Sequence, residues 1–330
     1  MIDHIEWNDE KIPGIILGTA QLGTPYGLSN TIGQPNALEA HKIVETALQH
    51  GIDCFDTAPI YGDSEKMLGN IFKRYKNIKV LSKVFLLDLK SDDVQKNSDF
   101  VIKTIEQTCK DLQIEQLWGA LFHCYQNLDI WHYGIKQGLN KAKRNGLVKY
   151  IGVSNYAYDR KEKTTDKNLY NILKMTDVDI VQDACNAWDH RLLRGYMDKQ
   201  MKSTGKLCLM RSIFLQGLLL LSPEETKKKI PEAYEASKMW NQIAEELNMT
   251  IKQLAFSFVV SSDVPFLVGV ESVEQVIDNV KMYKESKKDT NIIANIMRRM
   301  TPFLSPDIWY AIEMYGRKNY TWKGREKESH

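Results

Sequence analysis

The chain has 330 residues, of which 43% are hydrophobic and 26% are charged, so it can bury a large core and is not a disordered chain. Its 44 lysines and arginines nearly balance 42 aspartates and glutamates, which leaves a formal net charge of +2. This balance excludes a protein that holds nucleic acid or a membrane surface through its overall charge, and we expect neither partner.

The predicted elements begin with a short hairpin over residues 2–20, which turns at Asn8–Asp9 and leads into a first strand at Ile15–Gly18. Residues 21–36 are rich in Gly, Pro, Asn and Ser and predict a loop. From there, short apolar runs typical of buried parallel strands alternate with amphipathic segments typical of helices. The further strands are predicted at Asp53–Asp56, Val80–Ser82, Leu117–Phe122, Val148–Val153, Ile180–Gln182, Leu207–Arg211 and Phe266–Val268.

Helices are predicted between these strands, and a loop is predicted around Gly217 and Pro223. The helical segments are residues 36–48, Glu65–Arg74, Ser98–Leu112, Leu128–Arg144, a segment ending near Met175, Leu192–Lys202, Pro231–Leu247, Thr250–Val260 and Ser272–Tyr283. Eight strand–helix units predict a closed (β/α)8 TIM barrel, with all 330 residues in a single domain. The C-terminal extension, residues 285–330, is broken at Pro302 and Pro306 and is expected to pack on or near the pocket.

Four polar residues stand at or just after the ends of successive strands, where an α/β barrel carries its active site. They are Asp56, Tyr61, Lys83 and His123. A phenol is a weak acid at neutral pH, and an adjacent ammonium group favours its ionised form. A carboxylate can hold that ammonium in place, and an imidazole can orient a carbonyl group or relay a proton.

Each of these residues also has a structural explanation when it is taken alone. Asp56 could cap a turn, Tyr61 could be an aromatic residue at the rim, and Lys83 could be a surface charge. His123 could be a hydrogen-bonded core histidine. The four together, at consecutive strand ends, favour proton transfer to oxygen.

The order and spacing of these four residues resemble the catalytic tetrad of the aldo-keto reductase superfamily. Other motifs match the family in register, from about residue 14 to residue 279: GTA at 18–20, FDTAPIYG at 55–62, GVSN at 152–155 and the segment 182–186. The resemblance implies reduction of an aldehyde or ketone by NADPH or NADH. Tyr61 would donate the proton, Lys83 would favour the phenolate, Asp56 would hold Lys83, and His123 would orient the substrate.

The resemblance also implies a cofactor site. Ser154, Asn155 and Gln182 would bind the nicotinamide carboxamide, and Thr19 and Ala20 would lie along the ribose. All the positions implied for the cofactor are Thr19, Ala20, Asp56, Ser154, Asn155, Gln182, Arg211, Ser212, Phe214, Gly217, Gly269, Glu271, Gln275 and Asn279.

Two departures from the family pattern bear on this site. Arg211 stands where the family usually places an aromatic residue that stacks on the nicotinamide; it could stack, bind a substrate anion, or pair with a nearby acid. In the last loop, family members that prefer NADP often carry a lysine and an arginine, whereas this chain has Gly269 and Gln275. Glu271 lies nearby and suits a free ribose hydroxyl, but the choice between NADPH and NADH stays open.

Aromatic residues that could line a substrate pocket are Tyr26, Tyr125, Trp188, Phe303, Trp309 and Tyr310, although most residues of this kind pack in cores. The loop GTAQLGTPYGLSN resembles that of bacterial relatives associated with carbohydrate metabolism, so a sugar-like carbonyl substrate is expected. No cluster has metal-ligand spacing. The rival functions are a non-catalytic nicotinamide-binding redox sensor or regulatory subunit, and a barrel hydrolase or isomerase.

The five cysteines have no CxxC spacing, which favours reduced thiols and a cytoplasmic location. The N-terminus is too acidic and polar for a signal peptide. The most apolar stretch, residues 254–270, is interrupted by Asp263 and Pro265, which argues against a membrane span. The sequence leaves the oligomeric state open.

Overall fold

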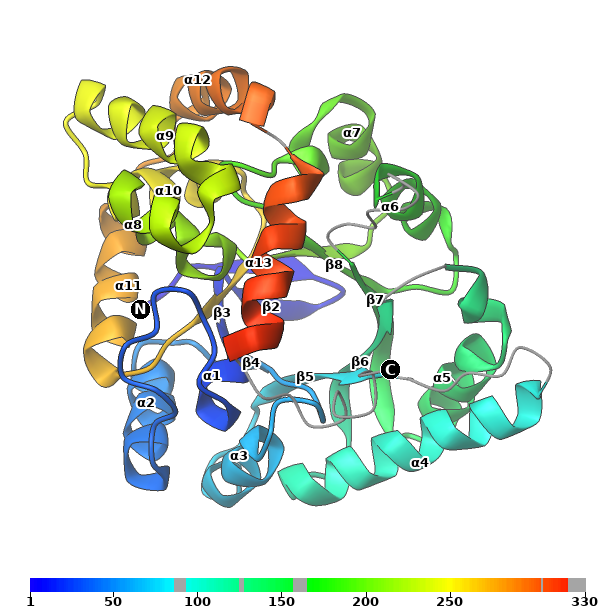
Figure 1. Cartoon of the computed structure of the whole chain (residues 1–330). Helices are drawn as coiled ribbons and strands as arrows, with labels where there is room; N and C mark the ends of the chain where they lie inside the picture. The colour runs from blue at the N-terminus through cyan, green and yellow to red at the C-terminus, as the bar shows by residue number, and fades with distance from the viewer. Residues whose placement is uncertain (86–92, 125–127, 157–164, 304, 320–330) are drawn as a thin grey trace.

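The computed structural model describes residues 1–85, 93–124, 128–156, 165–303 and 305–319. Eight parallel strands close into a barrel in the order β10-β3-β4-β5-β6-β7-β8-β9, and helices surround it (Figure 1). The barrel strands are β3 (Ile15–Gly18), β4 (Cys54–Asp56), β5 (Lys79–Val84), β6 (Leu117–Cys124), β7 (Val148–Asn155), β8 (Ile180–Ala184), β9 (Leu207–Arg211) and β10 (Phe266–Gly269). The predicted (β/α)8 barrel is therefore confirmed.

The helices follow the strands in the predicted alternation. They are α1 (Ala20–Gly23), α2 (Ala37–Gln49), α3 (Ser64–Phe72), α4 (Val94–Leu112), α5 (Ile135–Arg144), α6 (Thr165–Lys174), α7 (Gly195–Ser203), α8 (Pro223–Lys229), α9 (Tyr234–Glu246), α10 (Ile251–Ser261), α11 (Val273–Glu285), α12 (Thr290–Met300) and α13 (Pro306–Asn319). Short 3-10 helices are η1 (Leu128–His132), η2 (Arg191–Leu193), η3 (Leu215–Leu220), η4 (Pro231–Ala233) and η5 (Thr301–Phe303). The helix starts follow from capping: the Thr250 hydroxyl accepts from Gln253 N, and the Gln253 side chain accepts from Thr250 N.

Several helices differ from the prediction in their bounds or in their presence, and three of them have a clear local cause. The helix expected from Leu128 begins only at Ile135, because Gly134 adopts a left-handed conformation (φ 108°) that separates η1 from α5. Helix α4 begins at Val94, before the predicted start, since the Asp93 side chain accepts from Lys96 N. The loop predicted around Pro223 contains α8, whose start is a capping box between Ser222 and Glu225 with proline at the first helical position.

Alternation along the strands separates two apolar cores. One set of side chains packs between the strands and the surrounding helices. The other fills the barrel interior and includes Ile16, Cys54, Leu81, Leu121, Ile180, Leu209 and Leu267. The barrel is thus a packed core rather than a pore, and only its two ends can carry a site.

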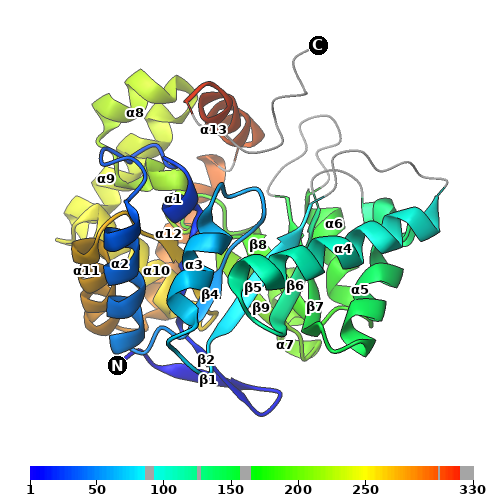
Figure 2. The same cartoon turned by 90° about the horizontal axis from the view of Figure 1, so that it is seen from below.

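The N-terminal hairpin covers one end of this interior. Its strands, β1 (His4–Trp7) and β2 (Glu10–Pro13), pair antiparallel and form a separate two-stranded sheet, at the opposite end of the barrel from α13 (Figure 2). The Trp7 ring packs against Trp118 and Tyr150, with ring centroids 6.1 and 4.7 Å away. The Trp118 indole donates to the Glu10 carboxylate at 3.0 Å. These contacts seal the amino ends of the barrel strands.

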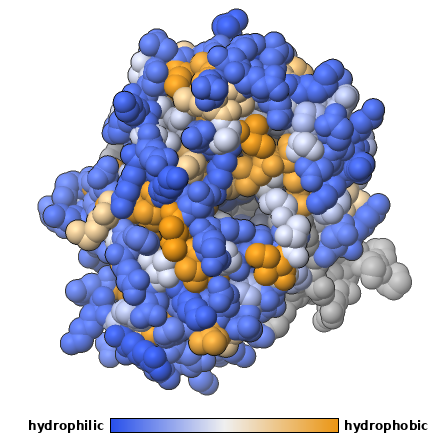
Figure 3. All heavy atoms as spheres, turned by 90° about the vertical axis from the view of Figure 1, so that its left-hand side faces the viewer, coloured by the Kyte–Doolittle hydropathy of each residue, from blue (hydrophilic) through white to orange (hydrophobic). Residues whose placement is uncertain are grey.

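The C-terminal helix α13 crosses the other end of the barrel (Figure 1). It is tied to the loop after β8, because the Trp309 indole donates to Asp189 Oδ2 at 2.7 Å. The face that carries α2, α8 and α11 is largely hydrophilic, with apolar residues gathered around a central hollow (Figure 3). Among the described residues, no helix combines the length and the apolar character needed to cross a membrane.

Candidate active site

The carboxyl ends of the barrel strands carry a ring of polar residues and glycines. Because side chains alternate along a strand, the residue two positions beyond an interior residue of each strand also faces the inside of the barrel. These positions are Gly18, Asp56, Lys83, His123, Ser154, Gln182, Arg211 and Gly269. Because apolar residues below and helices outside exclude water, charges in this ring interact through a medium of low polarity.

Lys83 is the centre of the tightest contacts in this ring. Its Nζ lies 2.6 Å from Asp56 Oδ1 and donates to the Thr57 carbonyl at 2.9 Å. The same Nζ lies 5.0 Å from the centroid of the Tyr61 ring. Lys83 and Asp56 are 2% and 3% exposed, so the ion pair is buried. Burial lowers the pKa of Lys83 below its ordinary value, and the Asp56 carboxylate opposes that shift.

A chain of buried hydrogen bonds fixes the other side of Asp56. Gln182 Nε2 donates to Asp56 Oδ2 at 2.9 Å, and the Ser154 hydroxyl donates to Gln182 Oε1 at 2.8 Å. Residues from β7, β8, β4 and β5 are thereby joined across the barrel. Both carboxylate oxygens of Asp56 accept a hydrogen bond, which holds the carboxylate in line with Lys83.

His123 lies in β6 beside Ser154 of β7 in the strand register. Its ring makes an edge contact with Phe85, with centroids 5.7 Å apart, and its side chain is partly exposed. The structure therefore places Asp56, Lys83 and Tyr61 together and puts His123 on the next strand of the same ring. His123 is not among the residues that line the pocket described next.

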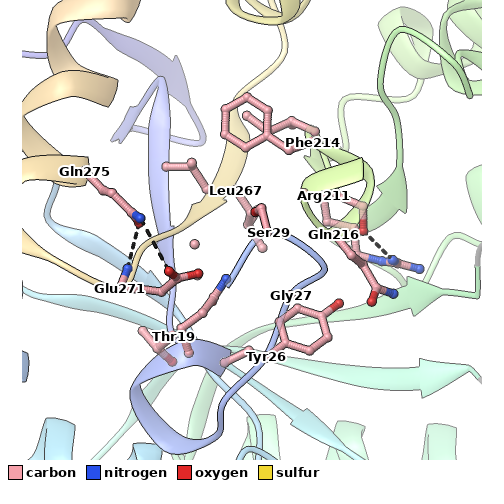
Figure 4. Close-up of a pocket in the computed structure, with 18 of the residues that line it drawn as sticks. Thr19, Tyr26, Gly27, Ser29, Arg211, Phe214, Gln216, Leu267, Glu271 and Gln275 are labelled. Carbon is pink, nitrogen blue, oxygen red and sulfur yellow. Dashed lines mark hydrogen bonds between the residues drawn. The ribbon is translucent and has the colours of Figure 1, made fainter. Parts of the chain in front are cut away.

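A pocket opens from this ring toward the starts of α10 and α11 (Figure 4). Of the cofactor positions implied by the resemblance, the pocket wall includes Thr19, Ala20, Asp56, Gln182, Arg211, Ser212, Phe214, Gly217, Gly269, Glu271, Gln275 and Asn279. Ser154 and Asn155 lie outside the wall, and the Ser154 hydroxyl donates a hydrogen bond to Gln182, which is part of the wall. Lining residues that the sequence reasoning missed are Gly18, Gln21, Gly27, Ser29, Ile213, Gln216, Leu220, Lys252, Leu267 and Val268.

The loop after β3 closes over the loop after β9. The Leu28 N–H donates to the Gln216 carbonyl at 2.7 Å. A Cβ at Gly217 would lie 2.2 Å from Ser29 Oγ, so only glycine allows this approach. Three residues of the second loop adopt positive φ angles that non-glycine residues rarely adopt and that concentrate at functional sites: Ser212 (58°), Leu215 (51°) and Gln216 (57°).

Arg211 pairs with its protein surroundings while it lines the pocket. Its guanidinium donates to the Asn155 carbonyl at 2.6 Å and to the Ser212 hydroxyl at 3.2 Å. Burial raises the pKa of Asp183 to about 6, and the charges of Arg191 and Arg211 oppose that shift. These hydrogen bonds go to a backbone carbonyl and a hydroxyl, and Arg211 reaches Asp183 through its charge alone, so the contacts do not single out one of the three interpretations of Arg211.

Two buried amide oxygens, one on the pocket wall and one just outside it, could accept hydrogen bonds from a dinucleotide. Asn155 Oδ1 and Asn279 Oδ1 are buried, and neither has a hydrogen-bond partner among the described residues. An amide group or an aromatic amine of a bound ligand would supply the missing donor. Asn155 lies next to the ring of polar strand ends, and Asn279 lines the pocket from α11. The described residues contain no group of three or more His, Cys, Asp or Glu residues that could hold a metal ion.

The aromatic residues predicted to line a substrate pocket differ in their placement. Tyr26 is on the pocket wall, whereas Trp188 is 2% exposed and packs in the core. Phe303 and Trp309 pack against the same core from outside the wall, and Tyr310 also lies outside it. Tyr125 falls outside the described residues.

Comparison with known proteins identifies the family. A model of the aldo/keto reductase family matches residues 14–298. D-arabinose 1-dehydrogenase of Saccharomyces cerevisiae is 23% identical, and the match covers 88% of this chain and 91% of that protein. L-galactose dehydrogenase of Arabidopsis thaliana is 27% identical, with 83% and 85% covered.

Solved structures show the same fold. An aldo-keto reductase from Bacillus halodurans superposes with a TM-score of 0.69 at 17% identity, covering 93% of this chain and 97% of that one. The Bombyx mori aldo-keto reductase in complex with NADP gives a TM-score of 0.64 at 16% identity, covering 91% and 93%. With the family model matched over nearly the whole chain, this protein belongs to the aldo/keto reductase family and is an NAD(P)H-dependent oxidoreductase.

Proposed function

We propose that this chain reduces the carbonyl group of a sugar-like aldehyde or ketone to an alcohol, with Tyr61 as the general acid. The observation that carries the proposal is the buried ion pair of Lys83 with Asp56, whose ammonium lies 5.0 Å from the Tyr61 ring. The names of two relatives, a D-arabinose and an L-galactose dehydrogenase, support a sugar-like substrate.

The roles of the residues follow from their contacts. A bound nicotinamide cofactor supplies the hydride. The Tyr61 hydroxyl gives its proton to the carbonyl oxygen, and the Lys83 ammonium stabilises the phenolate that remains. Asp56 keeps Lys83 charged and in place, and Gln182 holds Asp56 from the other side. His123 orients the carbonyl group from the neighbouring strand.

The cofactor would occupy the pocket between the ring of strand ends and the start of α11. Thr19, Ala20 and Gln182 line its inner part, and the loop after β9 lines another wall through Ser212, Phe214 and Gly217. The Asn155 side-chain oxygen would accept from the carboxamide. The direction of hydride transfer at this site is set by the cofactor's redox state.

Four of the five cysteines are described as buried free thiols: Cys54, Cys109, Cys185 and Cys208. Free thiols of this kind are typical of a reducing compartment, which supports a cytoplasmic location.

The test compares Tyr61→Phe with the unchanged protein on a panel of aldoses and simple aldehydes. Loss of the proton donor should lower turnover by about 10²–10⁴-fold. The dissociation constants of NADH and NADPH, measured by quenching of protein fluorescence, should change by less than about threefold because the ring remains in place. Turnover that survives the substitution would exclude Tyr61 as the acid.

A further inference from the structure

The pocket wall opposite Arg211 is formed by the end of β10 and the start of α11. Figure 4 shows Glu271 and Gln275 together on this side, across the pocket from Arg211. Tyr61 and Glu271 line the same pocket, so a dinucleotide with its nicotinamide beside Tyr61 would reach this wall with its adenosine half. The charges here would then lie near the adenosine ribose, which carries a 2′-hydroxyl in NAD(H) and a 2′-phosphate in NADP(H).

Glu271 is the acid held on this wall. Its side chain is nearly buried, with the residue 6% exposed. Gln275 braces it twice: Gln275 Oε1 accepts from Glu271 N at 2.9 Å, and Gln275 Nε2 donates to Glu271 Oε2 at 3.5 Å. The other carboxylate oxygen, Oε1, has no donor among the described residues. Burial raises the pKa of Glu271, so a ligand hydroxyl that donates to it would offset the cost of desolvation.

No unpaired cation balances this acid on the described pocket wall near Glu271. Gly269 has no side chain, and the space beside it is filled by Gln21, whose Oε1 would lie 2.3 Å from an added Cβ. Lys252 lines the pocket, but its ammonium forms an ion pair with Asp278. A 2′-phosphate would therefore be repelled by the Glu271 carboxylate, and Lys252 would not offset this repulsion because it is already paired with Asp278.

We propose that Glu271 makes this enzyme selective for NAD(H) over NADP(H), by accepting a hydrogen bond from the 2′-hydroxyl of the adenosine ribose and repelling a 2′-phosphate. The proposal rests on the proposed function, because it assumes that a nicotinamide dinucleotide fills this pocket. Gln275 is a positioning residue in this arrangement, since its amide orients the Glu271 carboxylate.

The test measures dissociation constants of NADH and NADPH by fluorescence quenching for three proteins. The unchanged protein should bind NADH at least about tenfold more tightly than NADPH, because only NADH can donate its 2′-hydroxyl to Glu271. Glu271→Gln keeps the size and removes the charge, and should lower the ratio of the NADPH to the NADH dissociation constant by about tenfold or more. The matched control is Glu274→Gln, an exposed acid three residues away, which should leave that ratio within about twofold. Glu271→Ser is a second variant, with a shorter side chain, and should lower the ratio in the same direction.

Competition with two nucleotides locates the effect. AMP should displace NADH from the unchanged protein better than 2′,5′-ADP does, because the two differ only in the 2′-phosphate, and Glu271→Gln should reduce that difference. Tighter binding of NADPH by the unchanged protein, or a ratio that neither Glu271 variant moves, would overturn the assignment alone. Failure of the folded protein to bind either dinucleotide would overturn the proposed function together with it.

Discussion

Glu65 offers a sharp test of the energetics behind the site. Its carboxyl lies between α3, β5 and α4: the Ser82 hydroxyl donates to Oε1 at 2.6 Å, and the Thr108 hydroxyl lies 3.4 Å from Oε2. The residue is 6% exposed, and burial raises the pKa of Glu65 to about 7 from its ordinary 4.5. Ser82 directly precedes Lys83, so this carboxyl stands just behind the catalytic strand.

The raised pKa makes stability depend on pH with a definite sign. Below pH 4.5 the carboxyl is protonated in both states, and between pH 4.5 and about 7 only the unfolded chain loses the proton. The contribution of Glu65 to the free energy of unfolding is therefore fully present at low pH and lost as pH rises through 7. A difference of about 2.5 pH units between the folded and unfolded pKa corresponds to about 3 kcal/mol.

Glu65→Gln removes this titration and keeps an acceptor for Ser82. Urea unfolding followed by tryptophan fluorescence, at pH 5 and at pH 8, gives the free energy of unfolding of each protein. The quantity compared is the free energy of unfolding of the variant minus that of the unchanged protein. This difference should be about 2–3 kcal/mol larger at pH 8 than at pH 5. Glu106→Gln, an exposed acid on α4, is the control and should follow the unchanged protein at both pH values. An identical stability difference for Glu65→Gln at the two pH values would refute the argument.

The remaining predictions concern the two cations of the ring. Lys83→Met leaves the Asp56 carboxylate buried without its partner, and should lower the free energy of unfolding in urea by about 3–5 kcal/mol. Adding Asp56→Asn should recover part of that loss, and a double variant that recovers none of it would count against an unpaired charge as the cause. Arg211→Gln removes a positive charge from the pocket wall, so the oxidised cofactor should gain about tenfold in affinity relative to the reduced one in fluorescence and competition titrations. An unchanged ratio would show that Arg211 lies too far from the nicotinamide.

The barrel and the strand-end residues could be predicted because both depend on local patterns. Short apolar runs alternate with amphipathic segments, and the side-chain period of two places Asp56 above Cys54 and Lys83 above Leu81. The sequence prediction misses α8 because it places Pro223 in a loop, although proline at the first helical position is a helix start signal.

The connections between distant segments could not be predicted in the same way. Gln182 reaches Asp56 across 126 residues of sequence, and no local pattern indicates which oxygen its amide contacts. The Asn155 atom that accepts from Arg211 is the backbone carbonyl oxygen, which every residue has, so the residue type at position 155 does not indicate this contact. Lys252 enters the pocket because α10 and α11 start on the same side of the barrel, which only the closed barrel determines.

The hairpin beneath the barrel has a kinetic consequence. Because Trp7 and its aromatic neighbours close the amino end of the barrel, the cofactor and the carbonyl substrate must both enter at the opposite end, where the loops after the strands lie. If the dinucleotide binds beneath the carbonyl substrate, it would have to enter first and leave last, and its release would then limit turnover whenever the chemical step is fast.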